Sequence, residues 1–135
     1  MFLSATRVVR IKMKQPLTVY GALGPEIFFR LVDAFYDGVA TDPVLRPMYP
    51  GDLTDSRRHL ALFLIQYYGG PTTYSDERGH PRLRARHVGF AIDHAARDAW
   101  LRHMRRAVDT LELPATALAE LMRYFDGAAD FLVNR

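Results

Sequence analysis

The sequence contains no cysteine and no apolar run approaching the roughly 20 residues that cross a bilayer. The first absence excludes a disulfide framework and any thiolate metal site. The N-terminal stretch MFLSATRVVRIKMK is interrupted by basic residues, so it lacks the apolar centre of a secretion signal. We therefore expect a protein with no integral membrane segment and, by default, a cytoplasmic location.

Acidic residues are missing from residues 1–14, which carry four basic side chains. The remaining 14 basic and 15 acidic residues leave the rest of the chain with a net charge of −1. The high pI therefore arises from the N-terminus, which argues against a fold that binds polyanions over its whole surface. We expect residues 1–16 to form a flexible basic extension and residues 17–135 to form one domain.

Apolar residues recur at helical spacing along nearly the whole chain, and no stretch alternates with the two-residue period of a strand. The pattern predicts an all-α fold with about four substantial helices. A proline- and aspartate-rich corner at 41–52 and a long loop at 71–80 separate them. The expected helices cover residues 18–23, 25–40, 54–68, 94–111 and 114–132, with a short segment at 82–88.

Each longer helix has one apolar face that we expect to be buried. Asp52 or Thr54 is the expected cap of the helix after the corner, and Asp93 that of the next long one. The predicted faces are Phe28, Leu31, Val32, Phe35, Tyr36 and Val39; Leu60, Phe63, Leu64, Tyr67 and Tyr68; Ala96, Trp100, His103, Met104, Ala107, Val108 and Leu111; and Leu118, Leu121, Met122, Phe125, Ala129 and Leu132.

The segment LRARHVGF places a histidine among arginines. If it is helical, Leu83 and His87 share a face, with Arg82 and Arg86 on a neighbouring stripe. The flanking guanidinium groups disfavour the imidazolium and keep His87 neutral, the form that binds a metal. By itself the segment is compatible with a core histidine, a metal ligand, a catalytic base or part of a nucleic-acid surface.

Three aromatic residues with polar groups lie elsewhere on predicted inner faces or in the corner. Tyr36, Tyr49 and Trp100 each have a donor that needs a partner when buried. Each is compatible with an ordinary core aromatic whose polar end reaches the surface. Together with His87 they suggest a pocket with a strong ligand on one side and hydrogen-bond donors on the other.

From Tyr20 to the C-terminus the sequence resembles the truncated haemoglobins, most closely their second group, typified by the actinobacterial oxygen-binding type. The stretches that carry the resemblance are AFYDGVATDPVLRPMYP, LALFLIQYYGGPTTYSDERGHPRLRARHVGF and RDAWLRHM. The resemblance implies a two-over-two helical sandwich that encloses a non-covalently held haem b.

The resemblance also implies roles around the iron and the haem edge. His87 is the expected iron ligand, and Arg86 is the expected partner of a haem propionate, assisted by Tyr74 and His80. His59 stands where many members carry an arginine directed at a propionate, and we expect it to lie in solvent.

On the opposite side of the haem, the resemblance assigns hydrogen bonding to the bound ligand to Tyr36, Tyr49 and Trp100. Leu60 and Phe63 are the expected apolar walls. Ser56 stands where the family usually has a small residue near the ligand entrance, and its hydroxyl adds a polar group there.

The function implied by the resemblance is binding of O2 and of other diatomic molecules such as NO and CO. We expect O2-linked redox chemistry, either NO dioxygenation or a peroxidase-like reaction, rather than O2 transport. Because the chain contains no flavin or nicotinamide domain, turnover requires an external reductase. Storage or sensing of O2 without turnover is the alternative, and a homodimer is possible.

Two readings from other classes compete with a haem protein. An all-α nucleic-acid-binding module would use Arg82, Arg84, Arg86 and the basic N-terminus, but the near-neutral charge and the lack of a helix-turn-helix pattern disfavour it. A hydrolase or zinc enzyme would use the histidines, which show no HExxH or similar spacing. Their positions are His59, His80, His87, His94 and His103.

Overall fold

A computed structural model describes residues 18–135, and these residues form helices joined by turns, with no strand among them. The predicted basic extension, residues 1–16, lies outside the described part of the chain. Within residues 18–135 no helix combines the length and apolar character that a membrane span requires. The helices are α1 (Val19–Leu23), α2 (Pro25–Val39), the 3-10 turn η1 (Arg46–Met48), α3 (Thr54–Tyr67), α4 (Thr73–Arg78), α5 (Leu83–His87), α6 (His94–Asp109) and α7 (Ala115–Leu132).

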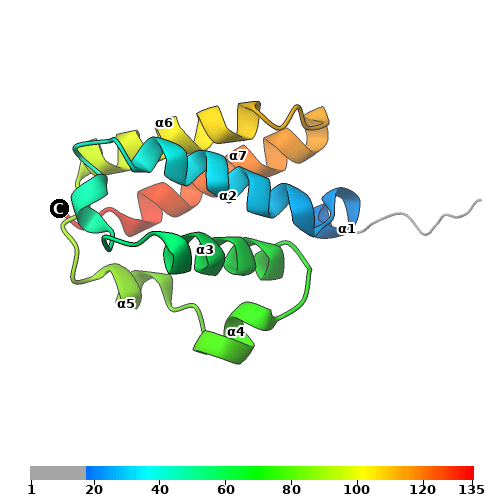
Figure 1. The fold of residues 1–135 in the computed structure, drawn as a ribbon, viewed down its shortest axis with the longest axis horizontal. Helices are drawn as coiled ribbons and strands as arrows, with labels where there is room; N and C mark the ends of the chain where they lie inside the picture. The colour runs from blue at the N-terminus through cyan, green and yellow to red at the C-terminus, as the bar shows by residue number, and fades with distance from the viewer. Residues whose placement is uncertain (1–17) are drawn as a thin grey trace, which may run out of the picture.

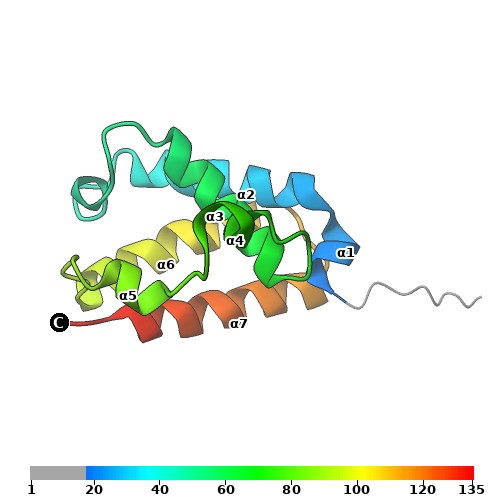
Figure 2. The same cartoon turned by 90° about the horizontal axis from the view of Figure 1, so that it is seen from below.

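Two pairs of helices form the body of the molecule. In Figure 1, α2 and α3 run in opposite directions, and so do α6 and α7. Contacts between α2 and α6 join the two pairs into two layers, seen from the side in Figure 2. The short helices attach at the edges, α4 against α3 and α5 against α7. The predicted two-over-two helical sandwich is therefore confirmed.

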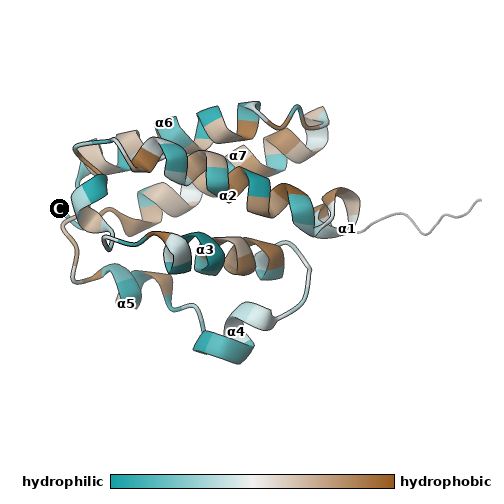
Figure 3. Ribbon diagram, in the orientation of Figure 1, coloured by the Kyte–Doolittle hydropathy of each residue, from teal (hydrophilic) through white to brown (hydrophobic). Residues whose placement is uncertain are grey.

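The core follows the predicted face of α2. All six expected residues of this face are buried, and Phe28, Leu31, Phe35 and Val39 have no exposed surface. Bands of hydrophobic and hydrophilic residues alternate along α2 and α6 (Figure 3), as amphipathic helices require. Across the interface the buried residues Leu64, Met104, Leu121 and Phe125 complete the core.

The predicted helix caps agree with the structure at one place and differ at another. Asp93 caps α6 by accepting the Ala96 amide at 2.8 Å, as predicted. At the start of α3, however, Leu53 takes the cap position and makes no side-chain cap bond. Asp52, the residue before Leu53, accepts a hydrogen bond from the Thr54 amide at 2.9 Å. It therefore stabilises the turn that leads into the helix.

The predicted long loop at 71–80 is wrong, because α4 occupies Thr73–Arg78. Long-range contacts explain this helix. The Gln66 side-chain amide donates to the Ser75 hydroxyl at 2.8 Å and accepts from the Ser75 amide at 2.9 Å. Tyr74 is buried against Phe63, with ring centroids 5.6 Å apart. Contacts with α3 therefore fix a turn that local propensity leaves undecided.

Tyr67 corrects the predicted face of α3, since its side chain is 53% exposed. Its ring lies against Tyr124 of α7, with centroids 4.1 Å apart, at the edge of the two layers. Other residues expected to be buried are only half-buried: Leu60, Phe63, Trp100, His103, Leu118, Met122 and Leu132. Of these, Leu60, Phe63, Trp100 and Leu132 line a cavity between the layers.

Adjacent phenylalanines of α2 provide a matched test of this core. Phe28 has no exposed surface and stacks between Tyr20 and Tyr68, whereas Phe29 is 40% exposed. We expect Phe28→Ala to lower the free energy of unfolding by about 3–5 kcal/mol, through lost burial and the cavity it leaves. Phe29→Ala should change it by about 0.5 kcal/mol. Urea unfolding measures both, and equal losses would contradict the described packing.

Candidate functional site

A cavity lies between the two layers, and side chains of α2, α3, α5, α6, α7 and the 40–53 corner line it. Including its mouth, it holds about 990 Å³ of space. Its walls are mainly apolar and include Leu60 and Phe63 of α3 and Leu132 at the end of α7. A few polar groups interrupt these walls, and such an arrangement suits a largely apolar ligand held by specific polar contacts.

His87, the last residue of α5, lines the cavity. Its Nδ1 lies 2.6 Å from the Leu83 carbonyl oxygen, one helical turn earlier. Because a carbonyl only accepts hydrogen bonds, Nδ1 carries a proton, and in the neutral ring Nε2 then keeps its lone pair. Within residues 18–135 no side chain or backbone group bonds to Nε2. Histidine ligands of metals are commonly oriented by such a bond at the other ring nitrogen.

The three predicted donors also line the cavity, and they come from three different segments. Tyr36 extends from α2, Tyr49 from the corner after η1, and Trp100 from α6. The rings of Tyr36 and Tyr49 meet edge to face, with centroids 5.5 Å apart. Trp100 packs in the same way against Phe35 and Phe125, at 5.5 and 5.7 Å. The fold therefore brings these donors and His87 to one cavity.

Burial keeps both phenols protonated. It raises the pKa of Tyr49 to about 12, against a smaller lowering by the Trp100 indole beside its hydroxyl. The pKa of Tyr36 is raised further above its ordinary value, by burial and then by Tyr49, while Arg57 and the Ser56 hydroxyl oppose the shift. At neutral pH both side chains therefore present an O–H donor.

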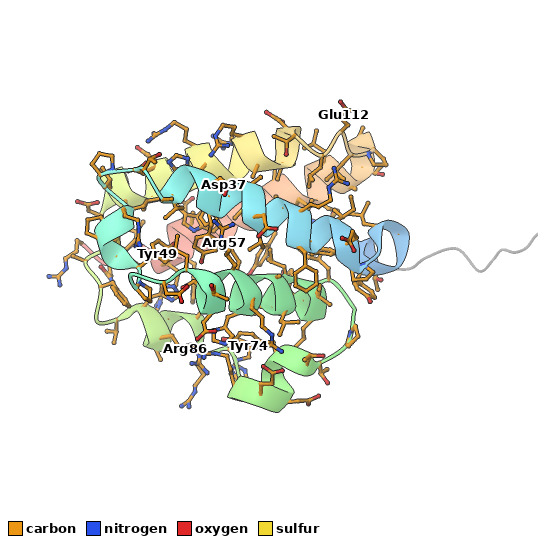
Figure 4. All side chains as sticks on the ribbon, viewed as in Figure 1. Asp37, Tyr49, Arg57, Tyr74, Arg86 and Glu112 are labelled. Atoms are coloured by element: carbon orange, nitrogen blue, oxygen red, sulfur yellow. The ribbon has the colours of Figure 1, made fainter. Side chains whose placement is uncertain are left out.

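The Arg57 guanidinium lies over the ring of Tyr36. The sequence did not predict this contact. Its guanidinium donates to the Asp33 carbonyl and carboxylate at 3.2 Å and to the Asp37 carboxylate at 3.2 Å, which joins α3 to α2. Figure 4 shows Arg57 between these helices, with Asp37 on α2. The same guanidinium lies 5.8 Å from the centre of the Tyr36 ring. A cation there holds the ring in place.

Arg46 holds the backbone that carries Tyr49. Its guanidinium donates to three successive carbonyls of the corner, at 3.2 Å for Tyr49, 2.9 Å for Pro50 and 2.8 Å for Gly51. Loop carbonyls that point to one cation cannot easily change direction. Sequence patterns do not reveal this arrangement, because it depends on the path of the loop rather than on a motif.

Asp42 fixes the start of the same corner and is the buried acidic residue of the described chain. One carboxylate oxygen accepts the amides of Val44 and Leu45 at 2.7 and 3.2 Å, and the other lies 2.5 Å from His103 Nε2 on α6. The hydrogen bond with His103, followed by the two amides, holds the pKa of Asp42 below its ordinary value. The TDP turn in the sequence hints at this aspartate, but not at its partner.

The structure places the other predicted site residues around the cavity rather than on its wall. Arg86 donates from Nε to the Pro81 carbonyl at 2.7 Å and from Nη2 to the Arg78 carbonyl at 2.8 Å. In the view of Figure 4, Tyr74 and Arg86 both lie below α3, and Tyr74 packs against Phe63. His80 is exposed, and its Nδ1 accepts the Arg82 amide at 3.0 Å.

Ser56 and His59 lie on α3, also outside the cavity wall. Ser56 is half-buried, with its hydroxyl directed at Tyr36. His59, expected in solvent, is half-buried beside α4. Its pKa is lowered by burial and then by the positive charge of Arg78. No three His, Cys, Asp or Glu side chains of residues 18–135 cluster as the alternative zinc enzyme would need.

Comparison with known proteins decides which family this architecture represents. The profile of the bacterial-like globins matches residues 18–133. The chain belongs to this family. The group 2 truncated hemoglobin YjbI of Bacillus subtilis is 43% identical over 116 residues, which cover 86% of this chain and 88% of that protein. The predicted membership of the second group of truncated haemoglobins is confirmed.

Solved structures agree with this assignment. A thermostable hemoglobin from the actinobacterium Thermobifida fusca superposes with a TM-score of 0.85 at 54% identity, over 87% of this chain and 98% of that one. The truncated oxygen-avid haemoglobin from Bacillus subtilis gives a TM-score of 0.83 at 43% identity, over 87% and 99% of the two chains.

Globins bind haem, and the residues of this cavity fit that group. An apolar slot suits the porphyrin, and the lone pair of His87 Nε2 is free of any described partner within it. Neutral imidazole is the common axial ligand of haem iron in globins. This chain therefore carries the donor and the walls that a haem requires.

Removal of the Asp42 carboxylate tests how the corner is held. We expect Asp42→Ala to lower the free energy of unfolding at pH 7 by about 1–3 kcal/mol, because two amides lose their acceptor. The folded-state pKa lies below the ordinary 3.8, so this stabilisation is present above that pH and is lost as the pH falls through the lower folded-state value.

The matched control is Asp126→Ala, which removes an exposed carboxylate paired with Arg105. It should change stability by at most about 1 kcal/mol. Chemical denaturation at pH 7 and at stepwise lower pH measures both variants. Equal losses in the two, or an unchanged acid dependence in Asp42→Ala, would show that Asp42 does not hold the corner.

Proposed function

We propose that this globin holds haem b through His87 and binds O2, and also NO and CO, on the side of Tyr36, Tyr49 and Trp100. Its use is O2-linked redox chemistry, either NO dioxygenation or a peroxidase-like reaction, rather than O2 transport. The supporting observation is the pairing within one cavity of an imidazole with a free Nε2 and three donors from other segments.

The iron would supply reversible binding of diatomic ligands and one-electron chemistry. His87 contributes an imidazole of fixed orientation, because the Leu83 carbonyl holds its Nδ1 proton. Arg86 lies outside the cavity wall with its Nη1 free of any hydrogen bond within residues 18–135, and we assign it to a propionate. Tyr74 and His80 support that edge of the pocket.

The donors determine how long a ligand stays. A hydrogen bond to a group with anionic character contributes about 1.5–3 kcal/mol. When a hydrogen bond must break before the ligand leaves, each 1.4 kcal/mol of its energy slows release about tenfold. Two donors therefore slow release about a hundredfold or more. Such slow release does not suit transport. The oxygen avidity of the Bacillus subtilis relative supports the same property here.

Repeated turnover needs an electron source, and we place this source outside residues 18–133, which match the globin family. An external reductase is therefore part of the proposal. Storage or sensing of O2 without turnover is the second candidate, and the slow release favours it equally. Rapid mixing of the oxygenated protein with NO, with and without a reductase, separates the two by whether nitrate forms repeatedly.

Replacement of His87 tests haem ligation. We expect His87→Gly to lose the Soret band and to regain it when imidazole is added, because free imidazole then fills the space of the ring. The control His94→Gly removes an exposed histidine at the start of α6 and should keep the band. Visible absorbance with far-ultraviolet circular dichroism measures haem content and folding. An unaltered Soret band in His87→Gly would contradict the proposal.

Replacement of Trp100 tests the donors. We expect Trp100→Phe to raise the O2 dissociation rate about tenfold or more, since the indole N–H is lost and the aromatic ring is kept. Tyr124→Phe is the control, because Tyr124 also lines the cavity but was assigned no part in ligand binding. Stopped-flow kinetics measure both rates. If Trp100→Phe releases O2 at the unaltered rate, the indole serves packing alone.

A further inference from the structure

An exposed basic and apolar surface lies on the outer side of α5. We call it the α5–α7 patch: Arg84, Val88 and Phe131 border one hollow, and Arg82 and Phe90 stand just before and just after this part of the chain. Val88 is 74% exposed, Phe90 43% and Phe131 49%. The patch joins two segments far apart in sequence, because α5 packs beside the C-terminal end of α7 (Figure 2). Clustered exposed apolar side chains of this kind mark interaction sites.

Arg84 and Phe131 form the preorganised centre of the patch. The Arg84 guanidinium stacks 4.1 Å from the centre of the Phe131 ring, and its Nη2 donates to the Phe131 carbonyl at 3.2 Å. Both side chains, with Val88, border a shallow hollow. Arginine and aromatic residues that are already held in place lose little entropy on binding, and they dominate many protein interfaces.

The patch carries positive charge that no carboxylate of residues 18–135 neutralises. Residues 78–92 contain four arginines and no acidic residue, and residues 1–17 contain no acidic residue either. Within residues 18–135, none of these four arginines pairs with an acidic side chain or with the C-terminal carboxylate. Elsewhere carboxylates do pair with arginines, namely Arg57, Arg58, Arg97, Arg102, Arg105 and Arg123.

The patch is the outer face of the wall that carries His87. Leu83 and His87 line the cavity from inside. Phe90 lines the cavity and is also exposed at the surface, and Leu132 lines both the cavity and the outer hollow. A protein seated on the patch is therefore separated from the cavity by one layer of side chains. This is a short path for an electron.

The charge of the patch, its exposed apolar side chains and its closeness to the cavity indicate what kind of partner it binds. This inference rests on the proposed function and its need for an external electron source. We propose that the α5–α7 patch docks an acidic electron-transfer protein. In the haem-loaded protein the docked donor would give up one electron and the ferric haem would take it up, so the donor would be oxidised and the haem reduced with no bond formed or broken. Arg82 and Arg84 attract the donor, and Phe131 and Val88 hold it after contact.

Other occupants fit less well. A second copy of this chain related by a twofold axis would place the arginines of the patch against each other. A nucleic acid is bound by phosphate contacts along an extended basic surface, whereas this patch is small and centred on apolar side chains. An acidic protein with an apolar contact region satisfies both the charge and the hydrophobic centre.

The test uses the full haem-loaded chain and a strongly acidic [2Fe–2S] ferredoxin as the probe. Calorimetry measures binding of the oxidised ferredoxin, and stopped-flow absorbance measures reduction of the ferric protein by the reduced ferredoxin. We expect Arg82→Glu with Arg84→Glu to weaken binding and slow reduction about tenfold or more, and to remove the salt dependence. Phe131→Ala should mainly speed dissociation.

The matched control is Arg30→Glu with Arg105→Glu, which changes the net charge equally on α2 and α6 and should alter binding less than about twofold. Equal weakening in both double variants, or no binding of the ferredoxin, overturns the proposal. The proposal is also overturned if a DNA duplex, or a second copy of the chain, binds the protein and only the patch variant loses that binding. An unaltered Soret band and full reduction by dithionite show that failure concerns docking rather than haem binding.

Discussion

The hydrogen bond between His87 Nδ1 and the Leu83 carbonyl is the contact on which the site depends. At 2.6 Å it uses one nitrogen of the ring and leaves the other, with its lone pair, to the cavity. Helical spacing of four residues within α5 places the two groups together, so the tautomer follows from local structure. Without this bond the imidazole could rotate or carry its proton on the other nitrogen, and the proposed iron ligand would not be fixed.

The opposite wall is held by contacts of a different kind. Tyr36 comes from a rigid helix, and Arg57 locks it where α3 is tied to α2. Tyr49 comes from an irregular corner, which Arg46 and the buried Asp42 keep in one conformation. Both tyrosines therefore depend on charged side chains outside the cavity. Substitutions at these supporting residues should alter ligand binding without touching the ligand.

Much of the fold could be read from periodicity, because long amphipathic helices record their buried faces in the spacing of apolar residues. The six-residue face of α2 is the clearest case. The short helix α4 could not be read in this way, since Gln66 and Phe63 of another helix stabilise it. Tyr67 has helical spacing but lies at the edge of the layers, a position that periodicity does not encode.

The candidate site was predictable where a residue acts through its own chemistry. His87, Tyr36, Tyr49 and Trp100 each have a distinctive polar group, and the fold brings them to one cavity. The residues that act through others, Arg57, Arg46 and the Asp42–His103 pair, were missed because their partners are distant in sequence. Arg86 shows a further limit, since its bonds to loop carbonyls follow from the path of the chain.

The most direct test of the account is the iron–ligand vibration of the ferrous, ligand-free protein. Resonance Raman spectra should be compared for protein made with ordinary histidine and with 15N-labelled histidine. The account predicts an iron–nitrogen stretch that shifts on labelling, as a neutral imidazole ligand requires. A spectrum without any band that responds to the label would contradict ligation by His87, and with it the proposed haem site.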